Sequence, residues 1–149
     1  MAKNFHEVVQ LIAREDSRYE PGAYFLVREG LDATLRTLKP ERRRQPVHVS
    51  GRQLSEGLRA HILDQYGPMS MTLLDTLGVR STEDFGNIVF TLIDYGIFAK
   101  NEDDRIEDFR EVFDFEEAFE FPFLSEEDRR ARRRIRKLQL RPAERPDTN

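Results

Sequence analysis

The sequence predicts a mainly α-helical domain with a small antiparallel β-hairpin, arranged in the order of a winged helix (α+β). Apolar residues recur at helical spacing through most of residues 5–94, and serine, glycine and proline signals divide residues 50–96 into three helices. Two short aromatic segments then flank an acidic loop, as the strands of a hairpin would. We therefore expect one winged-helix-like domain over residues 1–124, followed by a basic, partly disordered C-terminal helix or tail over residues 125–149.

Two helices are expected in the N-terminal part. The first presents one apolar face, formed by Phe5, Val8, Val9 and Ile12. The second begins at Pro21, because proline is favoured in the first turn of a helix, and it ends before Pro40. Its apolar stripe consists of Tyr24, Val27, Leu31, Leu35 and Leu38. The polar, proline-flanked residues 39–48 are expected to form a loop.

Helix boundaries are marked clearly in the central part. Ser50 and Gln53 fit a capping box, in which each side chain bonds to the backbone amide of the other residue. Gly67 ends that helix, Gly78 ends a short second one, and Ser81 begins a third. The side chains expected to face the core are Leu54, Leu58 and Ile62, then Met69, Leu73, Leu74 and Leu77, then Phe85, Ile88, Val89, Leu92 and Ile93.

The expected hairpin follows these helices. Residues 97–100 and 109–115 form its strands, and Asn101–Asp108 forms an acidic loop between them. Five phenylalanines between residues 113 and 123 are expected to be buried against the N-terminal helices, because a small domain needs their apolar area. The alternative is an outward-facing docking peptide formed by Phe119, Phe121 and Phe123.

Composition limits the size and the chemistry of the domain. A chain of 149 residues with 38% hydrophobic and 35% charged residues can bury one modest core. It contains no cysteine, which excludes disulfides and thiolate metal sites. It shows neither a secretory signal pattern nor an apolar run of the roughly 20 residues that span a bilayer. We therefore expect a cytoplasmic protein without a membrane segment.

Catalytic, metal and cofactor sites are not expected. His6, His48 and His61 fall in three different elements and lack metal-ligand spacing. The acidic loop has many carboxylates, but it lacks the glycine and the alternating ligand positions of an EF-hand, and Arg105 lies within it. The sequence therefore indicates a non-enzymatic protein with no cofactor.

The third central helix corresponds to the recognition helix of a winged helix. The residues off its apolar stripe are Glu83, Asp84, Asn87, Thr91 and Asp94. Their carboxylates would repel DNA, and the net charge of −4 also disfavours a nucleic-acid-binding role for the whole molecule. We expect this face to bind a partner protein, and a DNA-binding regulator is the last of three interpretations.

The C-terminal segment offers a second candidate surface. Acidic residues at 126–128 precede a basic run, an order that favours a helix through its dipole. The cations of this run are Arg129, Arg130, Arg132, Arg133, Arg134, Arg136 and Lys137. One interpretation is contact with RNA or the ribosome through phosphates. A second is that the acidic residues 101–120 and the basic residues 129–141 simply screen each other. A third is a tail helix docked on the body through Ile135, Leu138 and Leu140.

A family resemblance is carried by three strings, HVSGRQLSEGLR, YGPMSMTLLDTLGVRSTEDFGNIVFTLIDYGIFAK and FREVFDFEEAF. They resemble a small, functionally uncharacterised bacterial family reported mainly from planctomycete and verrucomicrobial genomes. The likeness covers residues 5–120, is most specific from Gly78 to Lys100, and excludes the basic tail. It implies a cytosolic single-domain protein and supplies no catalytic residue, cofactor or partner.

Overall fold

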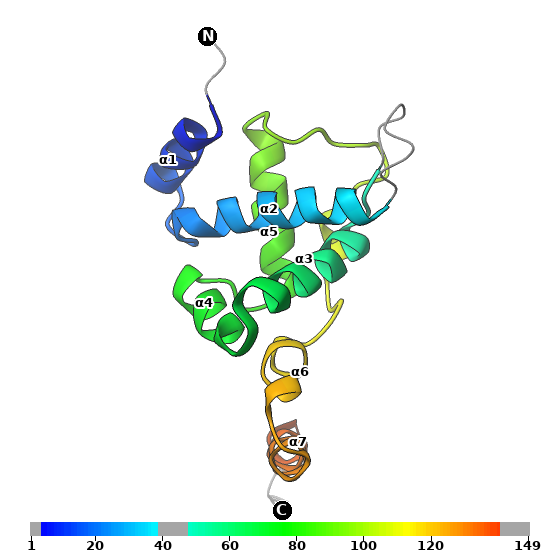
Figure 1. Ribbon diagram of the computed structural model, residues 1–149. Coiled ribbons are helices and arrows are strands. Elements are labelled where there is room, and N and C mark those ends of the chain that lie inside the picture. The colour runs from blue at the N-terminus through cyan, green and yellow to red at the C-terminus, as the bar shows by residue number, and fades with distance from the viewer. Residues whose placement is uncertain (1–3, 39–47, 141–149) are drawn as a thin grey trace, which may run out of the picture.

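The computed structural model describes residues 4–38 and 48–140, and all regular structure in that part of the chain is helical (Figure 1). Its α-helices are α1 (Phe5–Glu15), α2 (Pro21–Leu38), α3 (Gly51–Tyr66), α4 (Ser70–Leu77), α5 (Thr82–Asp94), α6 (Phe115–Phe119) and α7 (Glu126–Leu140). Short 3-10 helices are η2 (Gly67–Met69), η3 (Ile106–Phe109) and η4 (Phe121–Phe123). The predicted disorder of residues 141–149 and nearly all of the predicted loop at 39–48 lie outside the described residues.

The predicted helix boundaries in the central part are confirmed. Ser50 Oγ accepts a hydrogen bond from the Gln53 amide at 3.1 Å, and Gln53 Oε1 accepts one from the Ser50 amide at 3.0 Å. Gly78 closes α4 with a φ of +83°, a conformation that residues with a Cβ rarely adopt. Asp84 Oδ2 accepts from the Ser81 amide at 3.2 Å and so caps α5. Residues close in sequence therefore decide where these helices begin and end.

Helices α2 and α3 pack closely because each presents a glycine to the other. A Cβ on Gly30 would lie 2.1 Å from Leu58 Cδ2, and a Cβ on Gly57 would lie 1.9 Å from Thr34 Oγ1. The buried Thr34 donates its hydroxyl to Gly30 O at 2.6 Å, so its polar group is satisfied within α2. The two glycines set how near the helix axes approach each other.

The core is built around α5, which crosses α2 in Figure 1. Phe85, Ile88 and Leu92 of α5 are fully buried, together with Ile12 of α1 and Leu58 of α3. All of these residues belong to the apolar faces that the sequence predicts. Helical spacing of apolar residues therefore identified most of the core, but the prediction was wrong for Met69, which lies in η2 and is 60% exposed.

The predicted β-hairpin and the winged-helix α+β fold are wrong. No strand and no sheet occur in residues 4–38 and 48–140. Residues 97–100 form an irregular connection, and residues 109–115 lead from the end of η3 into α6. The described part of the chain is an all-α fold.

The first expected strand is diverted at the end of α5. Gly96 has a φ of +77° and turns the chain back toward the helix. The Ile97 amide then donates to Leu92 O at 2.9 Å. A backbone group that a strand partner would have bonded is thus satisfied by α5 itself.

The second expected strand is replaced by contacts with one side chain of α5. The buried Thr82 hydroxyl donates to Phe109 O at 2.7 Å, and its oxygen accepts from the Val112 amide at 3.2 Å. Glu111, which lies between them, has a φ of +45° that is incompatible with an extended strand. The backbone of this segment is therefore held by Thr82.

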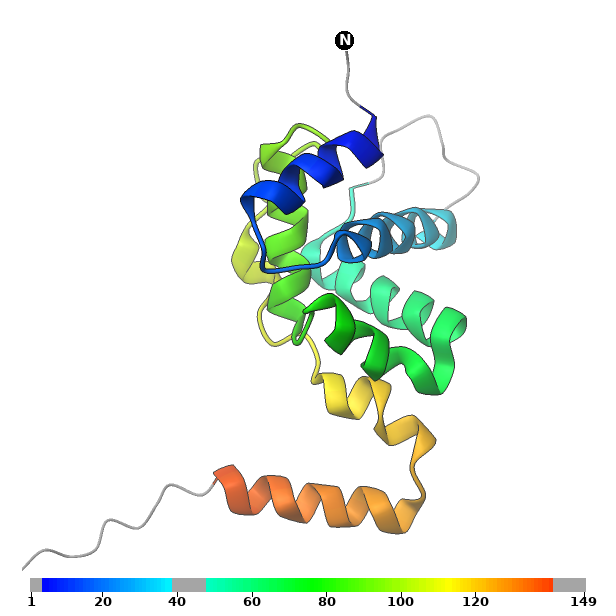
Figure 2. The same ribbon diagram turned by 90° about the vertical axis from the view of Figure 1, so that its left-hand side faces the viewer.

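Helices α6, η4 and α7 form a stem below the helical body (Figures 1 and 2). Phe115, Phe119 and Phe121 are buried, as predicted, whereas Phe123 is 46% exposed. They do not pack on the N-terminal helices, because α6 contacts α3 and α4, and the Phe115 ring lies 5.4 Å from the Phe85 ring of α5. The aromatic segment thus anchors the stem to the body.

Candidate functional site

The residues predicted to form a protein-binding face, Glu83, Asp84, Asn87, Thr91 and Asp94, all lie on α5 in different surroundings. Glu83 and Asp94 are exposed. Asp84 accepts a hydrogen bond from the Tyr19 hydroxyl, and Asn87 donates its amide to the same hydroxyl at 3.0 Å. Two of the five residues are therefore bonded to the chain between α1 and α2.

The environment of Tyr19 explains why a carboxylate lies at position 84. Tyr19 is only 5% exposed. Burial, together with the hydrogen bond to Asp84, raises the pKa of the Tyr19 hydroxyl well above its ordinary value. Asp84 also accepts from the Arg80 amide at 2.8 Å. Asp84 and Asn87 therefore hold the fold together, which leaves Glu83 and Asp94 as the fully exposed members of the predicted face.

The side of α7 that faces the body carries arginines paired with carboxylates near α6. Arg132 Nη1 lies 3.0 Å from Glu120 Oε2, and Arg136 Nη2 lies 3.1 Å from Asp114 Oδ1. Arg136 Nη1 also lies 3.6 Å from Glu117 Oε1. The basic helix therefore lies against acidic residues of its own chain.

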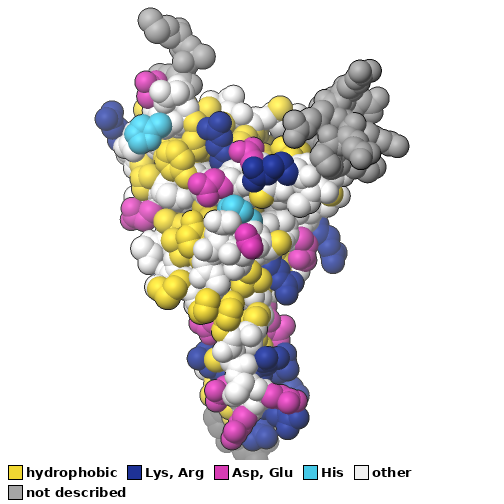
Figure 3. Space-filling view, viewed as in Figure 1, with side chains coloured by type: hydrophobic (Ala, Val, Ile, Leu, Met, Phe, Trp, Pro, Cys, Tyr) yellow, Lys and Arg dark blue, Asp and Glu magenta, His cyan; other side chains and the backbone are white. Residues whose placement is uncertain are grey.

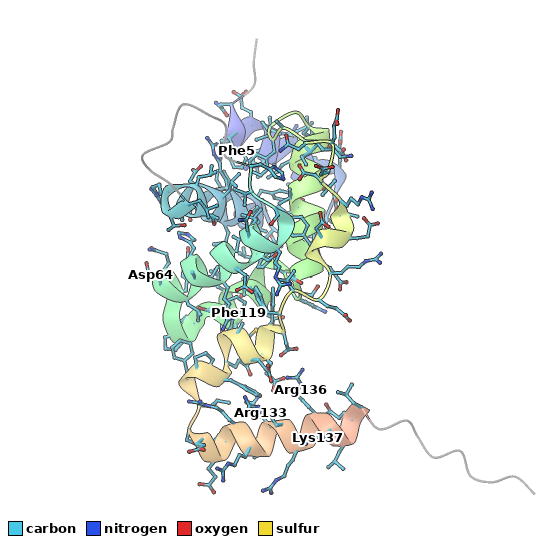
Figure 4. All side chains as sticks on the ribbon, turned by 90° about the vertical axis from the view of Figure 1, so that its right-hand side faces the viewer. Phe5, Asp64, Phe119, Arg133, Arg136 and Lys137 are labelled. Atoms are coloured by element: carbon cyan, nitrogen blue, oxygen red, sulfur yellow. The ribbon has the colours of Figure 1, made fainter. Side chains whose placement is uncertain are left out.

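Arg133 lies between the other two arginines of this contact. Its Nε is 3.8 Å from Glu117 Oε1, and its guanidinium lies 5.1 Å from the centre of the Phe121 ring. In Figure 4 the side chains of Arg133 and Arg136 extend from α7 toward α6. We call Arg132, Arg133 and Arg136 the arginine side of α7.

The remaining predicted RNA-binding residues have other surroundings. Arg129 donates to Leu124 O at 3.1 Å, and Arg130 pairs with Glu126 one turn earlier at 3.0 Å. Arg134 and Lys137 form no ion pair within the described residues. In Figure 3 the basic and acidic side chains intermingle on the stem.

The opposite side of α7 is an exposed apolar stripe. Ile135 and Leu138 are 51% and 67% exposed, and the exposed Ala131 lies one turn before Ile135. At about 100° per residue these three fall on one side of the helix, which we call the apolar stripe of α7. The predicted docking of this helix through Ile135, Leu138 and Leu140 is wrong, because all three are exposed and the arginine side faces the body instead.

A separate cavity of about 380 Å³ lies on the body between α2, α3 and α5. Its walls are mainly apolar, and its rim includes His48 and Asp104, whose Nε2 and Oδ1 atoms are 3.2 Å apart. The rim carboxylates already bond within the chain: Asp104 accepts from the Asn101 amide at 2.8 Å, and Asp108 from the Arg105 amide at 3.3 Å. These carboxylates therefore stabilise their own loop.

The three histidines lie in different parts of the fold. His6 lies on α1, and His48 precedes α3. His61 lies on α3, and its Nε2 is 3.6 Å from Oε2 of Glu29 on α2. Within residues 4–38 and 48–140, no three histidine or carboxylate side chains are grouped closely enough to hold a metal ion. In the same residues, no helix is both long and apolar enough to cross a membrane.

No protein-family model matches the chain, and no curated protein and no solved structure matches it either. The resemblance to a planctomycete and verrucomicrobial family therefore stays a prediction. Function has to be argued from the surfaces of α5 and α7.

Sequence reasoning missed the apolar stripe of α7 as an exposed surface. The sequence did suggest that acidic residues 101–120 and basic residues 129–141 pair with each other, but it gave no indication that Ile135 and Leu138 would then be exposed. The signal in the sequence that could have predicted which side of α7 is exposed is the acidic segment that forms α6. Asp114 and Glu117 are three residues apart, and so are Arg133 and Arg136. At this spacing each pair lies on one side of a helix, so a helix with the acidic pair and a helix with the basic pair can face each other with opposite charges.

Proposed function

We propose that the protein is a non-enzymatic, cytoplasmic interaction module that binds a partner protein through the apolar stripe of α7. The observation that supports this proposal is the orientation of α7. Ion pairs keep its arginine side toward α6, so Ala131, Ile135 and Leu138 stay exposed. Apolar anchors at this spacing are typical of a helix that enters a groove on another protein.

The residues beside the stripe indicate the chemistry of the partner. Arg130 and Arg134 are exposed and lie next to Ala131 and Ile135 on the helix surface. Cations at the edge of an apolar contact favour a partner with carboxylates at the corresponding positions. The proposed partner is a protein with an apolar groove rimmed by acidic residues.

A pulldown with the full chain as bait tests this proposal. We expect the double variant Ile135→Glu/Leu138→Glu to retain at least about tenfold less partner protein than the wild type, because buried anchors dominate such contacts. The extract is treated with nuclease beforehand, and retained proteins are quantified by mass spectrometry. Nuclease treatment ensures that a partner held only through nucleic acid is not counted.

The matched control is Leu140→Glu, which adds a carboxylate to α7 at an exposed leucine on the other side of the helix. It should retain the partner. An unchanged set of partners with the Ile135 and Leu138 double variant would refute the proposal. Loss of partners with Glu83→Lys/Asp94→Lys instead would assign binding to the exposed residues of α5.

The cytoplasmic location in this proposal is supported by the absence of cysteine from the chain. Its non-enzymatic character is supported by the separation of the three histidines. A DNA-binding regulator is not proposed, because that interpretation depended on a winged helix, and the described residues 4–38 and 48–140 contain no strand from which a wing could form.

A further inference from the structure

The ion pairs between α7 and the α6 region are exposed to solvent. The side chains of Arg132 and Arg133 are 48% and 56% exposed, and that of Glu117 is 51% exposed. Exposed pairs of this kind contribute little to stability. Helix α7 has no buried residue that would add apolar stabilisation. The carboxylates can therefore be displaced by another anion.

The carboxylates take the place that phosphate groups would occupy beside the arginine side of α7. Arg136 forms ion pairs with Asp114 and Glu117. Arg132 forms ion pairs with Glu116 and Glu120. A guanidinium binds carboxylate and phosphate oxygens through the same fork of N–H donors. A chain of phosphates can thus substitute for this row of carboxylates.

We propose that the arginine side of α7, formed by Arg132, Arg133 and Arg136, binds single-stranded RNA through its phosphates. In the absence of RNA, the carboxylates of the α6 region occupy this side. Binding then requires RNA phosphates to replace four carboxylates as partners of the arginines, those of Asp114, Glu116, Glu117 and Glu120. The α6 region acts as an internal competitor of the ligand.

Aromatic residues beside the arginine side favour RNA over an acidic peptide. Phe121 already lies under the Arg133 guanidinium, and Phe123 is 46% exposed immediately before α7. Bases of a single strand stack on exposed aromatic rings and on guanidinium planes. The carboxylates of an acidic peptide have no aromatic face that could stack on Phe123, whereas every nucleotide of RNA carries a base that can.

The charge of α7 also fits a polyanion. From Glu126 to Leu140 the helix carries seven cationic and three acidic side chains, and the acidic ones are confined to its first turn. Once the α6 carboxylates are displaced, the arginine side of α7 is a cationic surface, and the apolar stripe lies on the opposite side of the helix. Affinity for RNA should therefore fall steeply as salt concentration rises.

The test measures fluorescence anisotropy of a labelled oligouridine with the purified full chain at low salt. We expect Glu116→Gln/Glu117→Gln/Glu120→Gln to bind about tenfold more tightly than the wild type, since four of the five ion pairs between α7 and the α6 region no longer compete. Adding Arg132→Gln/Arg133→Gln/Arg136→Gln to this variant should abolish the gain. Far-UV circular dichroism checks that each variant keeps its helices.

The matched control removes the same charge from the acidic loop, as Glu102→Gln/Asp103→Asn/Glu107→Gln. These three residues are exposed and their side chains form no ion pair in the described residues. The control should bind oligouridine like the wild type. If it binds as tightly as the α6 variant, net charge alone explains the gain and the proposal is overturned.

A single substitution in α6 keeps the test valid if the triple variant fails to fold. Glu117 contacts both Arg133 and Arg136, so Glu117→Gln alone should give a smaller gain of the same sign. Absence of any RNA binding by both α6 variants would also overturn the proposal. The assay contains no partner protein, so its failure leaves the proposed protein-binding function standing.

Discussion

At the scale of single residues, two buried tyrosines differ in whether their hydroxyls are bonded. The Tyr19 hydroxyl donates to Asp84 and accepts from Asn87. The Tyr24 hydroxyl is buried with no hydrogen-bond partner among the described residues, and burial raises its pKa to about 12. An unbonded buried hydroxyl weakens a fold, whereas a bonded one stabilises it.

This difference predicts opposite effects of the same substitution. Tyr19→Phe should lower the free energy of unfolding by about 1–3 kcal/mol, because it removes the hydrogen bonds that the hydroxyl makes with Asp84 Oδ1 and with the side-chain amide of Asn87. Tyr24→Phe should be neutral or stabilising, because it removes only an unbonded hydroxyl. Urea denaturation of both variants measures the contrast. Equal losses would show that the two hydroxyls have similar surroundings.

Thr82 gives a second prediction at this scale. Its hydroxyl bonds to Phe109 O and the Val112 amide, which lie far from it in sequence. Thr82→Val should cost about 1–3 kcal/mol of unfolding free energy, because it leaves these buried backbone groups unsatisfied. Thr82→Ser keeps the hydroxyl and should cost distinctly less. A serine variant as unstable as the valine variant would refute the role assigned to the hydroxyl.

At the scale of elements, local signals predicted the helices better than their packing. The capping box of Ser50 and the turn at Gly78 involve neighbouring residues, so the sequence contains all that these boundaries need. The contact of Gly57 with Thr34 joins two helices and has no local signal. The wrongly predicted strand at residues 109–115 also lacks a local signal, because the hydroxyl that bonds to the backbone of residues 109–112 belongs to Thr82 of α5.

The close contact between α2 and α3 predicts that a methyl group added at Gly57 destabilises the fold. Gly57→Ala should lower the free energy of unfolding by about 1–3 kcal/mol, despite the better helix propensity of alanine, because its Cβ would overlap Thr34. The matched control is Gly22→Ala near the start of α2. Its Cβ would meet only the flexible end of Leu77 at 2.9 Å, so this variant should be close to wild type. Thermal unfolding compares the two.

At the scale of the whole molecule, α7 is an appendage of the helical body. In Figure 2 it lies at the end of the stem, away from the helical body. It buries no residue, and exposed ion pairs and one cation–π contact hold it to the segment of α6 and η4. The aromatic anchor of the stem lies before it, in α6 and η4. The stability of the body should therefore not depend on α7.

A truncated chain tests this independence. Residues 1–124 should unfold cooperatively with a melting temperature within a few degrees of the full chain, because the removed helix contributes only surface interactions of about 0–1 kcal/mol each. Circular dichroism on heating measures this. Truncation before Phe115 is the control, and it should destabilise the body strongly because Phe115 and Phe119 are buried. A large loss on removing α7 alone would contradict the assigned independence.

The sequence by itself determined the boundaries of the central helices and most of the apolar faces of the core, because spacing and capping act between residues less than about two turns apart. It also determined the charge division between residues 101–120 and 129–141. It did not predict α6, whose first residue was expected to end a strand. Only the tertiary structure decided that no hairpin forms, because the Thr82 hydroxyl and the turn at Gly96 satisfy the backbone there. It alone decided which side of α7 meets solvent, since that depends on carboxylates of the α6 region attracting its arginines across the stem.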